Sequence, residues 1–217
     1  MANRRLLRAQ VPGLKRLQWL DQVHGTEVVA VTPGQQPLQT ETADAAAVFA
    51  PGDGAVVMTA DCLPVFLTDA EGTMAAVAHA GWRGLCDGVL ERTVETLLRT
   101  RGDSAPLLAW LGPAIGPCHF EVGDDVRDAF LDAAPLSSEA VCAAFARHPQ
   151  RAGKWMMDIY ALARSRLQAA GVGDISGGGM CTVCDERHCF SYRRDGVTGR
   201  LASLIYLDSS PQKRLYT

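Results

Sequence analysis

Short apolar runs separated by polar breaks predict strands along much of the chain. Residues 54–69 (GAVVMTADCLPVFLTD) contain two such runs, interrupted by Ala60-Asp61-Cys62, and residues 73–80 (TMAAVAHA) contain a third. Brief apolar runs bounded by turn residues are typical of buried strands. Residues 27–34 and 105–113 follow the same pattern, and the first of these ends in a Pro-Gly turn.

Helical spacing of apolar residues appears in other segments. Residues 84–102 place Leu85, Val89 and Val94 near a helical period, and three segments read as amphipathic helices: 3–11, 122–134 and 154–172. Residues 189–208 predict a closing β-hairpin around Asp195-Gly196. Strands and helices are mixed without strict β-α-β alternation, which favours an α+β layered sandwich over a doubly wound sheet.

Length and composition place the chain among ordinary globular proteins. It has 217 residues, of which 47% are apolar and 21% charged, and we find no internal repeat or linker that would divide it. The predicted organisation is therefore one domain over residues 1–217. A net charge of −3 argues against a nucleic-acid partner and favours a small molecule.

The N-terminal residues are basic, but no long apolar segment follows them. We expect neither a secretory signal nor a membrane span. Seven cysteines, an odd number, without an export signal indicate reduced thiols in the cytoplasm rather than a disulfide framework. Nothing in the sequence predicts the oligomeric state.

Three polar breaks coincide with the ends of apolar runs, and each contains a side chain that can bind a metal or take part in catalysis. They contain His24 (QVHG), Cys62 (ADC) and His79 (HAG). Strand ends can converge at the rim of a sheet, and two imidazoles with one thiolate are good zinc ligands that leave a fourth position open. The alternative is that Cys62 and His79 are buried core residues, because their spacing matches no local metal motif.

The segment Gly81-Trp82-Arg83-Gly84 suggests an anion site. Glycines let the backbone approach a ligand, and the start of the helix that follows carries free N–H groups. Arg83 would then contact phosphate. The competing interpretation is a tight turn whose indole packs on the core.

The segment 181–196 (CTVCDERHCFSYRRDG) resembles a zinc knuckle, through Cys181 and Cys184 with His188 and Cys189. Adjacent His188 and Cys189 cannot easily turn toward one ion, and no second C-x2-C motif exists, so a structural zinc is the weaker interpretation. In the same segment, the donors of Arg193 and Arg194 suit a phosphate or carboxylate. If this segment is a strand, the two side chains point to opposite faces.

Cys118 and His119 follow a loop rich in glycine and proline (GPAIGPC), a kind of loop that often carries site residues. Cys118 is thus a candidate for substrate or phosphate binding. A thiol nucleophile with a histidine base is a further option. In an extended chain, however, neighbouring side chains point apart, which argues against His119 as the base for Cys118. Cys86 and Cys142 fall on predicted helices and are expected to be core thiols.

Five ordered motifs resemble one known family. QVHG, TADCLPV, HAGWRG, GPAIGPC with FEVG, and CT…FSYRR…TGR together are similar to the laccase-domain purine nucleoside phosphorylases, formerly filed as multicopper polyphenol oxidases and also described as peptidoglycan-editing factors. The resemblance extends from about Asn3 to about Leu207. It implies an α-β-β-α sandwich with mixed sheets. It also implies a zinc site formed by His24, Cys62 and His79.

The chain departs from the family pattern at two places. Most members carry a few tens of residues before the position of Asn3, so the N-terminus is shorter than usual and some substrate contacts are expected to be missing. The position of His119 usually holds cysteine or a small residue, and a histidine there could alter metal preference. Cys184, His188 and Cys189 are not part of the pattern, which further weakens the zinc-knuckle interpretation.

The resemblance implies phosphorolysis of adenosine, inosine and guanosine to the free base and ribose 1-phosphate. Adenosine deamination and methylthioadenosine cleavage are related activities, and an open-site zinc suits hydrolytic chemistry because it lowers the pKa of bound water. Asp61 is a candidate proton carrier or partner of a ligand histidine. Purine nucleosides and phosphate are the expected partners.

Other classes of protein remain as alternatives. Copper is possible at the site, but the five histidines are fewer than the type 1 and trinuclear centres of a multicopper oxidase require. Cys62 with His79 could form a thiol hydrolase acting on peptidoglycan precursors. A non-catalytic zinc-binding module would bind metal and turn over nothing.

Overall fold

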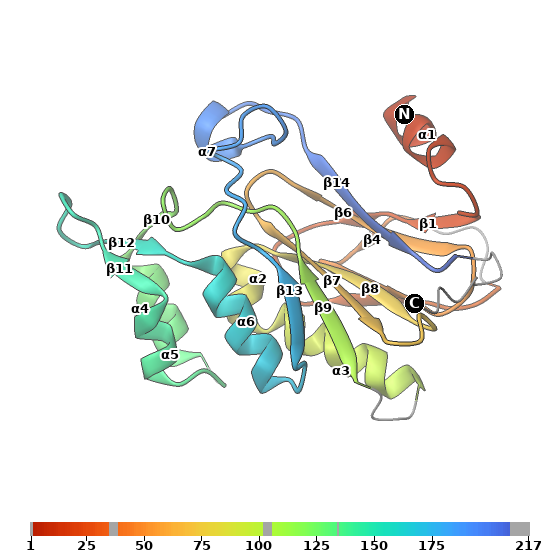
Figure 1. Ribbon diagram of the computed structural model, residues 1–217, viewed down its shortest axis with the longest axis horizontal. Coiled ribbons are helices and arrows are strands. Elements are labelled where there is room, and N and C mark those ends of the chain that lie inside the picture. Colours follow the sequence, from red (N-terminus) through yellow and green to blue (C-terminus); the bar gives the residue numbers. More distant parts are fainter. Residues whose placement is uncertain (1, 35–38, 102–105, 134, 209–217) are drawn as a thin grey trace, which may run out of the picture.

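The computed structural model describes residues 2–34, 39–101, 106–133 and 135–208 (Figure 1). Its helices are α1 (Ala2–Ala9), α2 (Trp82–Asp87), α3 (Val89–Arg101), α4 (Asp124–Asp132), α5 (Ser138–Ala143), α6 (Ile159–Ala169) and α7 (Tyr192–Asp195). Its strands are β1 (Arg16–Gln18), β2 (Leu20–Asp21), β3 (Val28–Val31), β4 (Glu41–Thr42), β5 (Ala45–Val48), β6 (Asp53–Thr59), β7 (Leu63–Asp69), β8 (Ala75–Ala80), β9 (Leu107–Leu111), β10 (Glu121–Gly123), β11 (Phe145–Arg147), β12 (Lys154–Met157), β13 (Asp174–Gly177) and β14 (Leu201–Tyr206).

Two mixed sheets form the centre of the molecule. The larger one has six strands in the order β13-β9-β7-β8-β5-β3, and the smaller one has three in the order β1-β6-β14. In the larger sheet β7 is antiparallel to both β8 and β9, whereas β13 is parallel to β9 and β3 is parallel to β5. Two further small sheets lie outside these: the two-stranded β2-β4 and the three-stranded β10-β12-β11.

Strand alternation divides the apolar residues between two cores. Ala75 and Val77 of β8 pack with Ala55 and Val57 of β6 between the two sheets. Their neighbours Ala76, Ala78 and Ala80 belong instead to the core under the helices. Successive side chains of a strand face opposite sides, so every second residue faces the same side. His79 is two positions after Val77 and therefore faces, like Ala75 and Val77, the space between the sheets.

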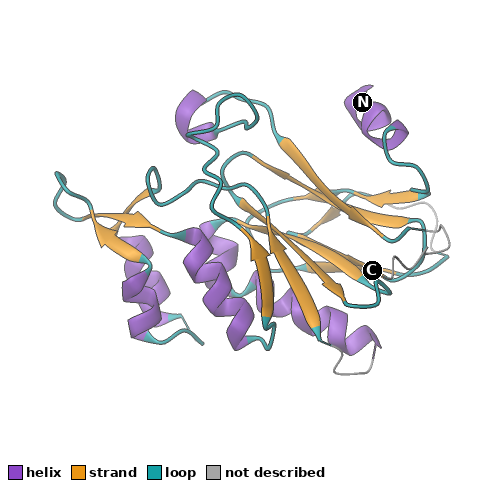
Figure 2. Cartoon of the chain, in the orientation of Figure 1, coloured by secondary structure: helices purple, strands orange, loops and turns teal. Residues whose placement is uncertain are grey.

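Helices cover the outer faces of both sheets. Apolar residues of α3 and α6, among them Leu90, Leu97 and Leu167, pack in the core of the six-stranded sheet. On the opposite side, Leu7 of α1 packs against Leu204 and Tyr206 of the three-stranded sheet. Figure 2 shows these helical layers outside the strands. The fold is thus α+β with mixed sheets in four layers, as the sequence predicted.

The main strands and the amphipathic helix at the N-terminus were predicted correctly, but four segments differ. The helix expected over 122–134 starts only at Asp124, because residues 122 and 123 belong to β10. The helix expected over 84–102 is two helices, because Gly88 takes a left-handed conformation (φ 100°) that ends α2. The segment 154–172 begins as β12, and α6 starts only after Asp158, whose side chain accepts from the amides of Tyr160 and Ala161. Gly102, Ala105 and Ala134, at the ends of expected elements, lie outside the described residues.

The hairpin expected over 189–208 is wrong. Ser191 caps a short helix, α7, by accepting from the amide of Arg194, so Arg193 and Arg194 are helical rather than extended. The only strand of the segment, β14, runs antiparallel to the distant β6 along its whole length. A second strand was expected where this helix and loop now form part of the site.

No helix among the described residues has the length and apolar character that crossing a membrane would require.

Candidate metal and substrate site

His24, Cys62 and His79 lie together at one end of the space between the sheets. One nitrogen of each imidazole and the Cys62 sulfur all lie within 4.8 Å of one another. The Nε2 atom of His24 is 3.8 Å from the sulfur, and the two imidazole rings meet edge to face with centroids 4.7 Å apart. The three strand-end residues singled out in the sequence therefore converge.

Strand register explains how Cys62 meets His79. β7 and β8 are antiparallel, with Leu63 paired to Ala80 and Pro64 paired to His79. Cys62 directly precedes Leu63, so the register places it beside the end of β8. The loop before it turns at Asp61, which has a positive φ of 95°. Left-handed conformations of non-glycine residues cost free energy and often occur at functional sites.

A buried carboxylate holds the two histidines. Asp44, fully buried, precedes β5 and accepts hydrogen bonds from the backbone amides of Val23 (3.1 Å), His24 (2.9 Å) and Gly25 (2.7 Å). These bonds fix the loop in which His24 adopts a positive φ of 62°. The same carboxylate lies 2.8 Å from Nδ1 of His79. An Nδ1–H donor to Asp44 leaves Nε2 of His79 free to bind a metal.

The charged groups around Cys62 and His79 shift each other's pKa values. Burial raises the pKa of Cys62, but its hydrogen bonds to His24 and His79 outweigh burial and bring that pKa down to about 6. Burial lowers the pKa of His79, but Asp44 and Cys62 raise it to about 9. The pKa of Asp44 is lowered: burial raises it, and the His79 contact and backbone amides overcome that effect. These shifts favour the thiolate of Cys62, the form that binds metals, whereas His79 has to release a proton when it binds one.

Two glycines let α2 pack closely against the loop that carries His24. A Cβ at Gly81 would lie 2.6 Å from Cδ2 of His24 and 3.3 Å from the Cys62 sulfur. A Cβ at Gly84 would lie 2.7 Å from the carbonyl oxygen of Gly25. Both glycines of GWRG thus allow α2 to approach the loop of His24. The donor set, two imidazoles and a thiolate, fits zinc.

A cavity of about 570 Å³ opens beside the three ligands. Its walls come from both sheets and from the loops after β2, β6 and β9. Its aromatic lining residues are Trp82, Phe120 and Tyr192, and its basic ones are Arg83, Arg193 and Arg200. That volume lies within the range typical of small-molecule sites, and the lining combines stacking surfaces with cations.

The arginines predicted to bind phosphate differ in their surroundings. Arg83 lies in the cavity wall with its guanidinium 4.7 Å from the ring centre of Trp82. Arg193 donates to the carbonyl oxygens of His119 (2.9 Å) and Glu121 (3.2 Å). Arg194 is absent from the described cavity lining, and its guanidinium donates to the carbonyls of Thr182, Val183 and Cys189 and pairs with Asp195. Arg83 is thus better placed for an anionic ligand than Arg194.

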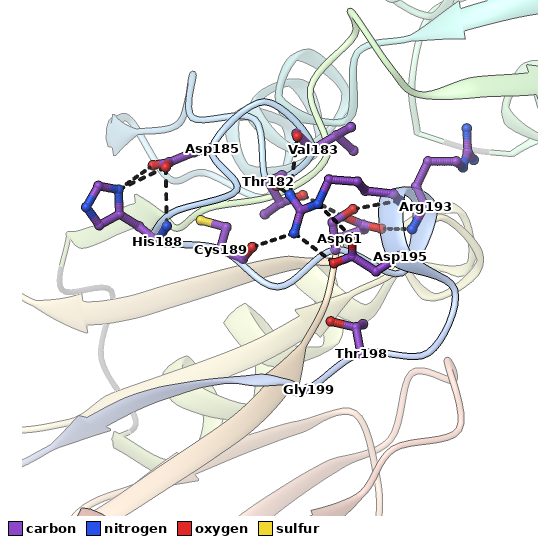
Figure 3. Close-up of polar contacts among 12 residues, drawn as sticks. Asp61, Thr182, Val183, Asp185, His188, Cys189, Arg193, Asp195, Thr198 and Gly199 are labelled. Atoms are coloured by element: carbon purple, nitrogen blue, oxygen red, sulfur yellow. Dashed lines mark hydrogen bonds and ion pairs between the residues drawn. The ribbon is translucent and has the colours of Figure 1, made fainter.

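Asp61 lies in the cavity wall but does not hold a ligand histidine, since that partner is Asp44. One Asp61 oxygen accepts from the hydroxyl of Thr182 (2.6 Å) and the other accepts from the amide of Arg193 (2.7 Å) (Figure 3). The carboxylate therefore joins the loop before β7 to the segment after β13. This contact positions the wall that carries Tyr192 and Arg193.

Cys118 and His119 lie in a turn rather than in extended chain, so the expectation that their side chains point apart is wrong. Nδ1 of His119 is 3.2 Å from the Cys118 sulfur, and Cys181 and Cys184 lie next to both. Cys118 lies outside the described lining of the cavity. His188 instead pairs with Asp185 (Figure 3), and Cys189 is buried elsewhere. Cys142, expected in the core, is exposed.

The sequence interpretation missed Asp44 and Arg200. Asp44 directly precedes the apolar run Ala-Ala-Ala-Val, so it follows the pattern of a polar residue at a strand end that identified the three ligands. Arg200 lies in the motif TGR, but nothing in the local pattern distinguishes it from an ordinary surface arginine.

Residues 1–208 match the family described as multi-copper polyphenol oxidoreductase laccase. The chain is 49% identical over 189 residues to purine nucleoside phosphorylase YfiH of Escherichia coli (strain K12). The aligned region covers 87% of this chain and 73% of that relative. It is 51% identical over 193 residues to a purine nucleoside phosphorylase of Pseudomonas aeruginosa, with 88% of this chain and 74% of the relative covered.

Solved structures show the same fold. A crystal structure of a Neisseria meningitidis protein has a TM-score of 0.83 at 45% identity and covers 95% of this chain and 80% of that chain. A hypothetical protein YfiH of Bacillus licheniformis has a TM-score of 0.84 at 29% identity, with 94% and 79% covered.

Proposed function

The chain belongs to the family described as multi-copper polyphenol oxidoreductase laccase, and we propose that it is a zinc-dependent purine nucleoside phosphorylase. The reaction converts adenosine, inosine or guanosine and phosphate to the free base and ribose 1-phosphate. The observation that carries this proposal is the meeting of His24, Cys62 and His79 within 4.8 Å at the wall of a cavity large enough for a nucleoside. The names of the two relatives near 50% identity support the reaction.

His24, Cys62 and His79 are the residues that would hold the zinc. A zinc ion with three protein ligands supplies a Lewis acid and an open position at the cavity. Asp44 fixes the orientation of His79 and the conformation of the His24 loop. The thiolate of Cys62 balances part of the positive charge of a zinc ion. A site with this thiolate is therefore expected to bind zinc more tightly than a site built from neutral ligands alone.

We assign the phosphate to Arg83 and the purine to the aromatic wall. Arg83 has no hydrogen-bonded partner among the described residues, so its donors are available to an anion. Trp82, Phe120 and Tyr192 offer faces on which a purine can stack. Arg193, tied to two carbonyl oxygens, positions the loop of Phe120 and supplies positive charge at a longer range.

Asp61 remains our candidate for proton transfer at the cavity. Two hydrogen bonds, from Thr182 and Arg193, hold its carboxylate at the wall, and a held carboxylate can accept or donate a proton at a defined position. Asp61→Asn should lower kcat more than it raises KM.

Phosphate-dependent release of hypoxanthine from inosine is the test of the proposal. Purified protein should release hypoxanthine only when phosphate is present, and His24→Ala should abolish turnover together with the metal bound by His24, Cys62 and His79. Cys142→Ser, at an exposed thiol outside the site, is the matched control and should keep both. Turnover by a His24→Ala protein that holds no metal at Cys62 and His79 would exclude the proposed role of the site.

Arg83→Ala tests the phosphate assignment separately. We expect the KM for phosphate to rise about tenfold or more, because a charge-assisted contact contributes about 1.5–3 kcal/mol. The KM for inosine should change little. An equal rise in both KM values would place Arg83 in general packing of the wall instead.

Adenosine deamination and methylthioadenosine phosphorolysis are further activities that we propose for the same cavity. The two reactions of adenosine give different products, inosine for deamination and adenine for phosphorolysis, so chromatography separates them. Omission of phosphate should leave only deamination. Both should disappear in His24→Ala if they share the site.

A thiol hydrolase acting on peptidoglycan precursors is the second candidate, and the lowered pKa of Cys62 favours it. Such an enzyme keeps its activity after treatment with a chelator and loses it with iodoacetamide. A zinc phosphorylase loses activity with the chelator and regains it with added zinc. A protein that binds zinc and releases no product from nucleosides or muropeptides would be a non-catalytic module.

A further inference from the structure

A second group of metal-binding side chains lies outside the cavity described above. It contains Cys118 and His119 from the turn after β9, and Cys181 and Cys184 from the turn after β13. These four residues are brought together from segments more than sixty positions apart. We propose that they form a second zinc site of Cys3His type, which fastens these two turns to each other.

The distances match those of a tetrahedral zinc centre. The Cys118 and Cys184 sulfurs are 3.7 Å apart, and tetrahedral ligation with Zn–S of about 2.3 Å gives sulfur pairs about 3.8 Å apart. Nδ1 of His119 lies 3.2, 3.7 and 3.4 Å from the sulfurs of Cys118, Cys181 and Cys184. The corresponding nitrogen–sulfur separation in such a centre is about 3.6 Å.

Backbone amides support a thiolate at Cys181. The N–H of Gly116 donates to the sulfur of Cys181 at 3.2 Å, and the N–H of Cys184 also faces that sulfur. A Cβ at Gly116 would lie only 3.0 Å from Cβ of Cys181. The two turns therefore pack as closely as backbone allows. Amide donors to a sulfur stabilise its charged form, which is the form that coordinates zinc.

Three thiols and one imidazole form a closed ligand set, unlike the open set of His24, Cys62 and His79. Closed sets of four are typical of structural zinc, whose binding energy adds to folding. The Cys181-x2-Cys184 motif thus finds its partners in Cys118 and His119. The nearby His188 and Cys189, which the sequence grouped with it, lie elsewhere.

The position of this second site indicates what it stabilises. Phe120 follows His119 directly and lines the cavity, and Arg193 donates to the carbonyl oxygen of His119. On the other turn, Thr182 follows Cys181 and donates to Asp61. A zinc ion here would hold both turns, and with them one wall of the cavity, in place.

Metal stoichiometry in the chain of residues 1–217 tests the proposal. We expect two zinc ions per chain in the wild type, one in His24→Ala, and one in the double variant Cys118→Ser/Cys184→Ser. Cys142→Ser should keep two. One zinc in the wild type and none in His24→Ala would overturn the second site.

X-ray absorption on the zinc of His24→Ala gives a test that needs no variant of the second site. We expect three sulfur ligands near 2.3 Å and one nitrogen near 2.0–2.1 Å, about the values of structural zinc sites. One sulfur or none would overturn the assignment. A mass spectrum showing the loss of two hydrogens, as from a Cys118–Cys184 disulfide in metal-free protein, would also overturn it.

Cadmium and heat provide independent readouts. Cadmium bound to His24→Ala should give the charge-transfer absorption of thiolate ligands, and Cys118→Ser/Cys184→Ser added to that variant should abolish it. Removing the second zinc from His24→Ala with a chelator should lower the melting temperature by several degrees. An unchanged melting temperature would rule out the fastening role.

Discussion

At the scale of single residues, the site depends on one buried carboxylate, Asp44, that lies behind the cavity lining. The two oxygens of Asp44 accept four hydrogen bonds: one oxygen faces the His24 amide and His79, and the other faces the amides of Val23 and Gly25. An asparagine cannot replace it, because its NH2 group would meet donors in either orientation.

Asp44→Asn should therefore weaken metal binding at His24, Cys62 and His79. Loss of a carboxylate behind a ligand histidine typically costs about 10–100-fold in metal affinity. Competition with a chromophoric chelator measures this, with Asp128→Asn as a control because Asp128 is exposed on α4. Equal zinc affinities in Asp44→Asn and Asp128→Asn would contradict the positioning role.

Individual residues were predictable where their chemistry interrupted an apolar run. His24, Cys62 and His79 do so, and the structure brings them together. The second cluster was not predictable, because its members come from two turns whose contact depends on the whole fold. Adjacent Cys118 and His119 were expected to point apart, but a turn from Gly116 directs both side chains to one place.

At the scale of elements, α2 reaches the His24 loop because glycines occupy position 81, just before the helix, and position 84, in its first turn. Gly81 precedes the helix with φ of −65° and ψ of 159°, a conformation open to any residue. A side chain there is excluded by space alone, since its Cβ would lie 2.6 Å from the His24 ring. A substitution at Gly81 therefore tests the steric clash with His24 alone, without adding backbone strain.

Gly81→Ala should displace His24 while leaving the fold intact. A displacement of about 1 Å at a reacting group can cost about 100-fold in rate, and we expect a loss of turnover of that order together with weaker metal binding. Gly173→Ala is the control, because a Cβ at Gly173 would meet nothing within 4 Å. Full turnover in Gly81→Ala would mean that His24 is not needed where it lies.

Elements were predictable where apolar periodicity was continuous. The runs of β6, β7 and β8 are almost entirely buried, and their apolar composition marks them clearly. Short edge strands such as β10 and β11 carry few apolar residues, so no periodicity revealed them. The hairpin prediction failed because Asp195-Gly196 resembles a hairpin turn, whereas the cap at Ser191 and the distant partner β6 determine the outcome.

At the scale of the whole molecule, Tyr160 connects the helical layer to both turns of the second cluster. Its hydroxyl accepts from the amide of Ala114 (2.8 Å) and lies within hydrogen-bonding distance of the carbonyls of Gly112 (3.1 Å) and Met180 (2.7 Å). Tyr160→Phe leaves the buried amide of Ala114 with only its longer contact, 3.4 Å to the carbonyl oxygen of Met180. We expect a loss of about 1–3 kcal/mol in the free energy of unfolding, measured by urea denaturation at neutral pH.

The same hydroxyl makes stability depend on pH in the alkaline range. Burial and the charges of Cys181, Cys189 and Asp158 raise the pKa of Tyr160 to about 12, although the Ala114 amide opposes this shift. An unfolded tyrosine ionises near pH 10, roughly its reference value. Because the folded state retains the proton longer, this contribution to stability is complete below the unfolded pKa and is lost as pH rises toward the folded pKa.

The comparison with Tyr160→Phe isolates that contribution from other groups that titrate at high pH. Between about pH 10 and 12 the wild type should lose stability faster than the variant, so the difference between them narrows. Urea denaturation of both proteins at several pH values measures the difference, and tyrosinate absorbance locates the ionisation. If the difference in the free energy of unfolding between the two proteins stayed constant up to about pH 12, Tyr160 would ionise equally in the folded and unfolded chains. The three contacts of its hydroxyl in the folded state argue against that outcome.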